Sequence, residues 1–292
     1  MRLEAVECLS LASGRDNEDR AGRAGTLAWV IDGATDVLAA PLTRGGTDAA
    51  WFAEAMHRAL EAMAAGAPPS LAAVPQRVAE TLAPAFTMAA CRPPQGRNEH
   101  PSAAATIVRA HPNGDLEHVG LGDCVLIAET TSGLARIGID EAEAGDVWVA
   151  QALAASAEPI DEDEPKKDPM TRADLWPRLA AQRARMNTDG GYGIFSITPP
   201  PPGLIRHGTL QCRPGARILL ATDGLTRLVE VFRRYDAASL FAAAWTHGLA
   251  SLVAELRALE NADADCRRHP RAKISDDATG LLLRLTPDEP AR

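Results

Sequence analysis

Two short apolar runs in the chain each lead to an aspartate that is followed by glycine. Residues 26–32 end at Asp32, and residues 218–222 are followed by Asp223. Apolar runs of this length bounded by glycine are typical of buried strands. The pattern therefore predicts two buried strands, each of which delivers one carboxylate to its end.

A further acidic element lies near the N-terminus, between two predicted strands. Residues 3–12 and 26–32 are short and apolar with glycine beside them, and they flank an acidic turn at 14–20. Strands are the expected structure for both segments. The triplet Asn17-Glu-Asp19 is therefore expected on a connection that faces outward from a strand end.

Apolar residues at helical spacing predict helices early and late in the chain. The first helix begins at Thr47 or Asp48, either of which can cap it, and ends at Gly66. A second helical region covers about 70–90 and contains two prolines that must start or kink it. Later helices are expected at about 225–231, 237–246 and 249–261.

Between these helical regions the apolar period changes to that of strands. The segments 104–110, 116–129 and 134–139 are joined by Asn113-Gly114 and by residues 131–133, which are strong hairpin signals. They predict an antiparallel meander, with Asp123 between a glycine and an apolar strand. A second hairpin is expected from 206–211 and 217–222 around residues 213–215, besides strands at 192–198 and 281–285.

The region from about 140 to 190 interrupts this order. Residues 158–169 are acidic, broken by proline and lack an apolar face, so they predict an exposed, flexible insertion. A basic helix is expected at 172–186, and its Arg183 and Arg185 could meet a phosphopeptide, although arginines on a helix usually belong to a solvated face. The complete order of elements predicts a single α+β domain over residues 1–292, with antiparallel sheets and helices packed outside them.

Composition narrows the functional classes. The chain has 292 residues, 46% of them apolar, and a net charge of −9. This acidic balance, without a stripe of Lys and Arg, argues against nucleic acid as a partner. The five cysteines are scattered and form no C-x-x-C pair, and no apolar stretch is long enough to span a membrane. A cytoplasmic location is the resulting expectation.

The repeated placement of acids at strand ends points to metal binding. Two unpaired carboxylates a few ångströms apart repel by about 4 kcal/mol at an effective dielectric constant of about 20. A cluster of acids is therefore tolerable only around a cation. Ligands that are all oxygen atoms favour Mg²⁺ or Mn²⁺ over zinc or copper.

Five acidic motifs, in this order along the chain, resemble those of the metal-dependent protein Ser/Thr phosphatases (type 2C, PPM), in a divergent bacterial branch. Each motif is weak alone, but five in the family's order are a specific signal. They are Asn17-Glu-Asp19, Val30-Ile-Asp-Gly33, Gly122-Asp123, Ala221-Thr-Asp-Gly-Leu225 and Ser275-Asp-Asp-Ala-Thr279.

The resemblance implies a four-layer α/β/β/α sandwich with a site for two Mg²⁺ or Mn²⁺ ions at one edge. Asp32 would bridge both ions, and the Gly33 carbonyl would bind one of them. Asp223 and Asp276, rather than Asp277, would hold the other. Glu18 and Asp19 would act mostly through metal-bound water, and Asp123 would join Asp223 at a weaker third site.

The implied reaction is hydrolysis of phosphoserine or phosphothreonine in a protein by a metal-activated water. A phosphorylated protein would be the substrate, and a Ser/Thr kinase a further partner. The sequence also departs from the family. Gly14 stands where members carry a phosphate-binding arginine, which makes Arg15 the candidate for that role, and Cys124-Val125 replaces the usual Ser-Arg.

Other interpretations remain open at this point. Taken singly, Asp32 and Asp223 could each belong to an ordinary Asp-Gly turn at the end of a strand. The same fold could also serve a phosphatase of small phosphorylated metabolites. A third alternative is a catalytically weak module that binds a phosphoprotein or a kinase.

Overall fold

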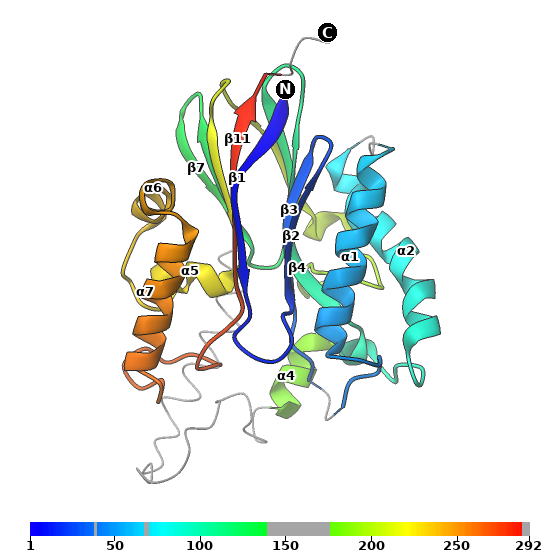
Figure 1. Cartoon of the computed structure of the whole chain (residues 1–292). Coiled ribbons are helices and arrows are strands. Elements are labelled where there is room, and N and C mark those ends of the chain that lie inside the picture. The colour runs from blue at the N-terminus through cyan, green and yellow to red at the C-terminus, as the bar shows by residue number, and fades with distance from the viewer. Residues whose placement is uncertain (38–39, 67–69, 139–175, 288–292) are drawn as a thin grey trace.

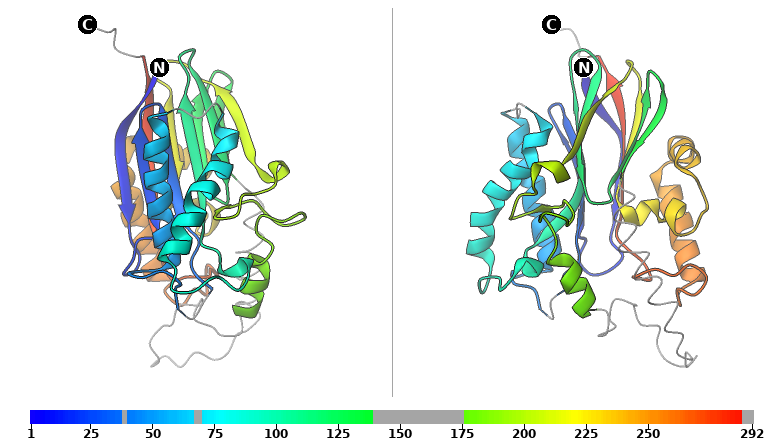
Figure 2. Two further views of the ribbon diagram at one scale, coloured as in Figure 1. Left: turned by 90° about the vertical axis from the view of Figure 1, so that its right-hand side faces the viewer. Right: turned by 180° about the vertical axis from the view of Figure 1, so that it is seen from behind.

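The computed structural model describes residues 1–37, 40–66, 70–138 and 176–287. Two antiparallel β-sheets lie face to face at the centre, and helices cover the outer face of each sheet (Figures 1 and 2). The predicted α+β class and the sandwich of two antiparallel sheets flanked by helices are therefore confirmed. None of the described helices is long and apolar enough to cross a membrane.

Sheet A has the strand order β1-β11-β10-β6-β7, all neighbours antiparallel. It combines the first strand of the chain with the last one, so that residues from both ends of the sequence lie side by side. Its strands are β1 (Arg2–Leu11), β11 (Ala278–Thr286), β10 (Arg217–Ala221), β6 (Val125–Thr130) and β7 (Gly133–Ile137).

Sheet B has the strand order β2-β3-β4-β5-β9, and the short strand β8 also pairs with β4. Its central strand β4 is buried along its whole length, as expected for a strand with a layer on either face. The strands are β2 (Asp19–Ala24), β3 (Leu27–Gly33), β4 (Ser102–Ala110), β5 (Asp115–Leu121), β8 (Phe195–Ser196) and β9 (Arg206–Gln211).

Two groups of helices form the outer layers, and α4 lies at the lower end in Figure 1. Helices α1 (Asp48–Ala64) and α2 (Val74–Ala89) cover sheet B. Helices α5 (Asp223–Glu230), α6 (Ala237–His247) and α7 (Leu249–Ala262) cover sheet A, and α4 spans Trp176–Arg183. Short 3₁₀ helices span Leu71–Ala73, Arg97–Glu99 and Pro202–Leu204.

Three apolar cores separate the four layers. One lies between sheet B and its helices around Trp29 and Phe52, and a second lies between the two sheets around Val30 and Leu220. The third lies between sheet A and its helices around Leu256. Trp29 and Val30 are neighbours on β3 and belong to different cores because successive side chains of a strand point to opposite faces.

The strands expected at 3–12 and 26–32 are confirmed as β1 and β3, which belong to sheet A and sheet B respectively. Strand β3 pairs with β4 and with β2, and β2 was not predicted because its first residues were assigned to the acidic turn. Its sequence, Asp19-Arg-Ala-Gly-Arg-Ala24, has no large apolar residue, so no strand pattern was visible.

The expected meander and the later hairpin are corrected. The segment 116–129 is two strands, and the chain passes from sheet B to sheet A between them, at residues 122–124. Strands β9 and β10 likewise lie in different sheets, so residues 213–215 connect the sheets and do not close a hairpin. The hairpins at Asn113-Gly114 and at residues 131–133 are confirmed.

The helix predictions are closer to the structure. Thr47 caps α1, where its side chain accepts a hydrogen bond from the Ala50 N–H at 3.0 Å. Helix α5 begins at Asp223, two residues earlier than expected. Within 192–198 only Phe195–Ser196 forms a strand. Residues 139–175, most of the predicted insertion at 140–190, lie outside the described part of the chain.

Candidate active site

Two of the predicted acids lie opposite each other at one end of sheet B. Asp19 is the first residue of β2, and Asp32 is the last but one of β3. The two residues are direct partners in the antiparallel pairing of these strands. Neighbouring positions of this kind have Cβ atoms about 5 Å apart. The register of a single strand pair therefore brings two carboxylates together.

Two more acids reach the same place from other parts of the chain. Asp123 lies where the chain passes from β5 of sheet B to β6 of sheet A. Asp223 is the first residue of α5, directly after β10 of sheet A. Both interact electrostatically with Asp32. The site is therefore built at the end of the sandwich where the two sheets exchange chain segments.

The glycine after Asp223 allows α5 to begin against sheet A. Gly224 is buried, and a Cβ atom at this position would overlap the backbone carbonyl of Asp277. Only glycine therefore permits the N-terminus of α5 to approach the segment that enters β11. The Asp-Gly pair here serves a close contact between two backbones, and the interpretation as a simple turn is unnecessary.

A threonine pair joins the two sheets at this end. The Thr222 hydroxyl donates a hydrogen bond to the Asp19 carboxylate at 2.8 Å, across the boundary between the sheets. The same hydroxyl accepts a hydrogen bond from the Thr279 N–H at 3.1 Å, and the Thr222 N–H donates to the Thr279 carbonyl at 3.0 Å. This arrangement holds Asp19 against the ends of β10 and β11.

The electrostatics of Asp32 are dominated by burial and by other acids. Burial raises the pKa of Asp32 well above its ordinary value, and the neighbouring carboxylates of Asp223, Asp19 and Asp123 raise it further. Repulsion among buried carboxylates favours a shared proton or a bound cation. The charge distribution around Asp32 is therefore unfavourable for an ionised carboxylate unless a proton or a cation is bound there.

Asp19 has the same character, although two threonines moderate it. Burial raises the pKa of Asp19, and the charges of Asp276 and Asp277 add to this effect. Hydrogen bonds from Thr222 and Thr279 lower it in part. The side chain is 1% exposed, so water does little to stabilise its charge.

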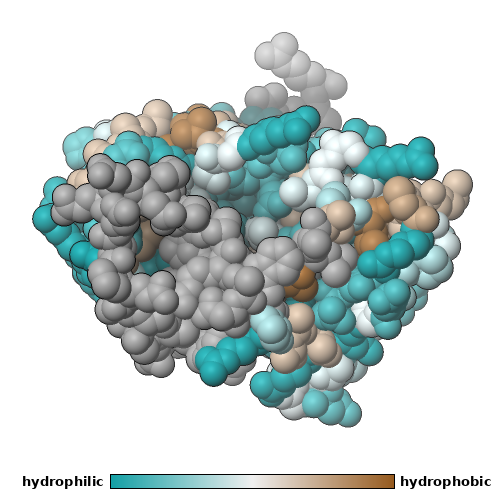
Figure 3. All heavy atoms as spheres, turned by 90° about the horizontal axis from the view of Figure 1, so that it is seen from below, coloured by the Kyte–Doolittle hydropathy of each residue, from teal (hydrophilic) through white to brown (hydrophobic). Residues whose placement is uncertain are grey.

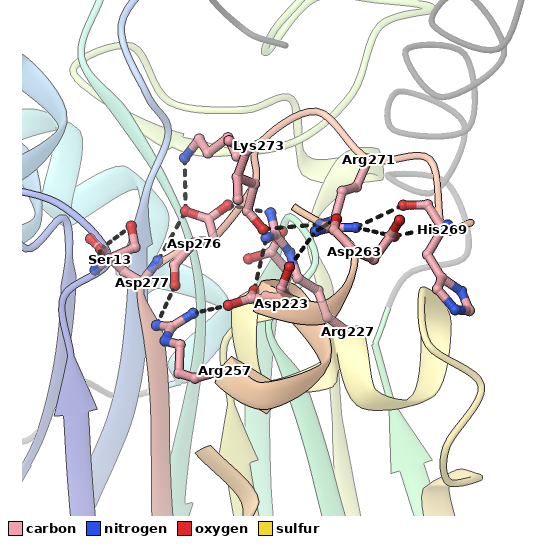
Figure 4. A network of polar contacts seen from close by, with 12 residues as sticks. Ser13, Asp223, Arg227, Arg257, Asp263, His269, Arg271, Lys273, Asp276 and Asp277 are labelled. Carbon is pink, nitrogen blue, oxygen red and sulfur yellow. Dashed lines mark hydrogen bonds and ion pairs between the residues drawn. The ribbon is translucent and has the colours of Figure 1, made fainter. Parts of the chain in front are cut away.

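Asp276 differs from the other acids because two cationic side chains already hold it. Its Oδ1 accepts a hydrogen bond from the Lys273 ammonium at 2.8 Å, and its Oδ2 accepts one from the Arg227 guanidinium at 2.8 Å (Figure 4). Burial would raise the pKa of Asp276, but Lys273 and Arg227 outweigh burial and hold it below its ordinary value. Asp276 is therefore ionised and paired.

Arg227 is fixed by a second carboxylate behind it. The buried Glu260 lies 3.4 Å from the Arg227 guanidinium, and it also accepts a hydrogen bond from Arg257 at 2.6 Å. Arg257 in turn donates to the backbone carbonyl of Asp276 at 2.6 Å. This network anchors α5 and α7 to the segment that enters β11.

The neighbouring Asp277 has a structural role instead. One of its carboxylate oxygens accepts hydrogen bonds from the Ser13 N–H at 2.7 Å and from the Ser13 hydroxyl at 3.0 Å. The other accepts a hydrogen bond from the Glu18 N–H at 2.6 Å. Asp277 therefore fixes the connection between β1 and β2, while the oxygens of Asp276 are held by Lys273 and Arg227.

The remaining predicted site residues lie near this group or on its rim. The Glu18 side chain accepts a hydrogen bond from the Thr35 hydroxyl at 2.7 Å, and its carbonyl accepts one from the buried Gly33 N–H at 2.9 Å. Arg15 is exposed on the connection between β1 and β2. Its side chain can therefore meet a ligand only from the solvent side.

Arg183 is a site neighbour whose role the sequence analysis missed. It was predicted to face solvent, but it is 7% exposed and donates to the backbone carbonyls of Ala34, at 2.7 Å, and Thr35. It also donates to the Ser102 hydroxyl at 3.1 Å. Arg183 therefore fixes the loop that directly follows Asp32. A basic helix gives no sequence signal for such an inward position.

The donor set fits a divalent cation in charge and chemistry. Asp19, Asp123 and Asp223 are oxygen donors whose charges all disfavour the ionised form of Asp32. As the side chains stand, however, no three His, Cys, Asp or Glu residues of the described chain are arranged to hold one metal ion. Ligation therefore requires these carboxylates to change position, while Asp276 is held by Lys273 and Arg227.

Among the residues that the structure describes, those visible at this end of the sandwich are largely polar. Figure 3 shows this end from below, where hydrophilic residues predominate among those coloured by hydropathy and apolar residues lie singly or in small groups (Figure 3). A polar surface of this kind suits a charged, water-soluble ligand better than a lipid or an apolar one.

Comparisons with known proteins show the fold. No family model and no curated protein matches the sequence. Among solved structures, the Mycobacterium tuberculosis serine/threonine phosphatase PstP/Ppp is similar over 98% of this chain and 100% of its own, with 16% identity and a TM-score of 0.58. A bacterial serine phosphatase is similar over 98% and 100%, with 11% identity and a TM-score of 0.54.

A further similar structure is the catalytic domain of PstP in complex with two manganese ions. It covers 97% of this chain and 98% of its own, with 15% identity and a TM-score of 0.53. In each case the similarity extends over nearly the whole of both chains. The chain therefore has the fold of the bacterial serine/threonine phosphatases, the fold that the PPM-like motifs of its sequence implied.

Proposed function

We propose that this protein is a metal-dependent phosphatase that hydrolyses phosphoserine or phosphothreonine in a protein substrate. The observation that carries the proposal is the meeting of Asp19, Asp32, Asp123 and Asp223 at one end of the sandwich. These acids come from four separate segments, and the other three each raise the cost of ionising Asp32. Their common position is explained if a cation binds among them.

The comparisons support the reaction class. The similar structures are phosphatases of serine and threonine residues, and one of them holds two manganese ions. Mg²⁺ or Mn²⁺ is therefore the cation that we assign to this chain. A bound divalent ion would lower the pKa of a water molecule and neutralise the phosphoryl oxygens.

The acidic residues of the chain would bind the cation, and their neighbours would orient them. Asp32 and Asp223 would be the principal ligands, with Asp19 and Asp123 beside them. The Thr222 hydroxyl keeps the Asp19 carboxylate turned toward the site. The expected roles of Gly33 and Glu18 as further ligands, and of Arg15 in binding phosphate, belong to the same proposal. Asp276 would be a ligand only if it left Lys273 or Arg227.

The test measures hydrolysis of p-nitrophenyl phosphate and of a phosphothreonine peptide. The protein is stripped with EDTA, and Mn²⁺ or Mg²⁺ is then added back. Activity should appear only with the added ion. Asp32→Asn and Asp223→Asn should each lower kcat/KM at least about 100-fold, because the electrostatic help of such an ion amounts to several kcal/mol. Asp265→Asn, at an exposed site, is the matched control.

The alternative is a phosphoprotein-binding module with little catalysis. The observation that favours it is the pairing of Asp276 with both Lys273 and Arg227, which occupies a carboxylate that the phosphatase reaction would use. Metal-independent binding of the phosphopeptide, together with no hydrolysis at any Mn²⁺ concentration, would support this module and contradict the proposed enzyme.

A further inference from the structure

Lys273 reaches into the group of acids from the connection between α7 and β11. Its ammonium donates to the Asp276 carboxylate at 2.8 Å (Figure 4). It also donates to the Thr35 hydroxyl at 2.7 Å. Thr35 lies on the loop that follows Asp32, on the side of sheet B. The lysine therefore bridges segments attached to the two different sheets.

The surroundings of the ammonium group are those of a bound cation. Its strongest favourable electrostatic partners are the carboxylates of Asp276, Glu18 and Asp32, and its side chain is only 21% exposed. A lysine is cationic at neutral pH and presents a compact charge with three donors. Here a side chain of the protein supplies a positive charge where oxygen ligands converge.

The sequence makes this lysine unusual. Apart from the adjacent Lys166 and Lys167, Lys273 is the only lysine in a chain that otherwise uses arginine for positive charge. The planar guanidinium of arginine is larger and has its donors in a fixed fork. A compact ammonium is the better match to a position otherwise suited to a single small cation.

Both oxygens of Asp276 are already used in this arrangement. Lys273 holds Oδ1, and Arg227 holds Oδ2 from a position fixed by the buried Glu260. For Asp276 to bind a divalent ion, it would have to leave at least one of these partners. The ion would then lie close to the ammonium group, and the two positive charges would repel each other.

We propose that the Lys273 ammonium is a tethered replacement for one divalent ion, so that this chain binds one Mn²⁺ or Mg²⁺ at Asp32 and Asp223 instead of two. The inference rests on the proposed function for the location of the remaining ion. It assigns to Asp276 the role of partner to the lysine. The site would thus contain two positive groups, one exchangeable divalent ion and the ammonium group of Lys273.

The test counts the ions bound by the full chain, independently of catalysis. Equilibrium dialysis and Mn²⁺ electron paramagnetic resonance should find one Mn²⁺ per wild-type chain with micromolar or tighter affinity. Lys273→Met should bind a second Mn²⁺, because Asp276 loses its ammonium partner while Arg227 holds only one oxygen. Arg77→Met, which removes an exposed positive charge from α2, should leave the count at one.

A second variant keeps the test valid if Lys273→Met is poorly folded without metal. Lys273→Met combined with Asp276→Asn removes both members of the pair, leaves the net charge of the site unchanged and should again bind one Mn²⁺. All samples are purified in Mn²⁺ and dialysed to a defined free concentration. After the metal has been stripped with EDTA and the EDTA has been removed by dialysis, Mn²⁺ addition should raise the Tm of Lys273→Met more than that of the wild type.

The outcomes separate this inference from the proposed function. Two Mn²⁺ per wild-type chain, or an unchanged count in Lys273→Met, would overturn the role of the lysine, whatever the activity. A count of one that becomes two in Lys273→Met would support it, even if no phosphatase activity were found, and in that case only the proposed reaction would fail.

Discussion

Asp36 gives a quantitative test of the electrostatics beside the site. Its carboxylate accepts a hydrogen bond from the Asp48 N–H at the start of α1, at 2.8 Å. Burial, opposed in part by that hydrogen bond, raises the pKa of Asp36 from its ordinary value of 3.8 to about 6. Asp36→Asn removes the ionisable group, while the amide oxygen can still accept the same hydrogen bond.

The sign and size of the effect follow from this pKa. Because the folded state binds the proton more tightly, the stabilisation is complete below pH 3.8 and is lost as the pH rises through about 6. The full loss is about 3 kcal/mol, since one pKa unit corresponds to about 1.4 kcal/mol. Roughly 1 kcal/mol of it falls between pH 5 and pH 7. Asp36→Asn should therefore be more stable than the wild type at pH 7.

The assay is urea unfolding at several pH values from 5 to 7.5, in EDTA so that metal binding does not vary with pH. The free energy of unfolding of the wild type should fall by about 1 kcal/mol more than that of Asp36→Asn over this range. Asp265→Asn, at an exposed position, should follow the wild type. Parallel pH profiles for the wild type and Asp36→Asn would refute the assignment of a raised pKa to Asp36.

Three further predictions concern the residues that hold the site together. Asp277→Ala removes the acceptor for the Glu18 N–H and should lower the free energy of unfolding by about 3 kcal/mol; a loss under about 1 kcal/mol in urea titrations would contradict the role of that carboxylate. Gly122→Ala should destabilise the fold and lower activity, because Gly122 has a φ of +78° and a Cβ atom there would overlap Ala104; an unchanged Tm would speak against this. Arg183→Met should lower kcat and should reduce the free energy of unfolding by about 2 kcal/mol, because two loop carbonyls lose a charged donor. Kinetics and thermal unfolding measured on the same sample check this, and wild-type values in both would contradict the role of Arg183.

The acids and their approximate positions could be predicted from the sequence because each follows a local rule. A buried apolar run that ends in an acid places a carboxylate at the end of a strand, as for Asp32. For Asp223 the same rule predicts the location, although the residue begins α5. The helices around the sheets follow from apolar spacing and from caps such as Thr47. These features depend on residues that are close in the chain.

Features that depend on distant residues could not be predicted. Which strands share a sheet is decided by packing, and neither side of residues 122–124 carries a signal that the chain changes sheets there. Strand β2 lacks large apolar residues because its neighbours supply the core. Arg183 was expected on a solvated face, and no sequence pattern singled out Lys273, since their partners Ala34 and Thr35 lie 149 and 238 positions away in the sequence.

The pairing of β1 with β11 also determines where a label or a tag can be attached without approaching the acids. Arg2 pairs with Thr286 at one end of sheet A, and Leu11 pairs with Ala278 at the other, next to the acids (Figure 1). Nine strand residues span about 30 Å. A fluorescent label or a capture tag joined to the N-terminus, directly before β1, would therefore lie about a strand length from the carboxylates. Surface-immobilised protein would present its acidic end to the bulk solution.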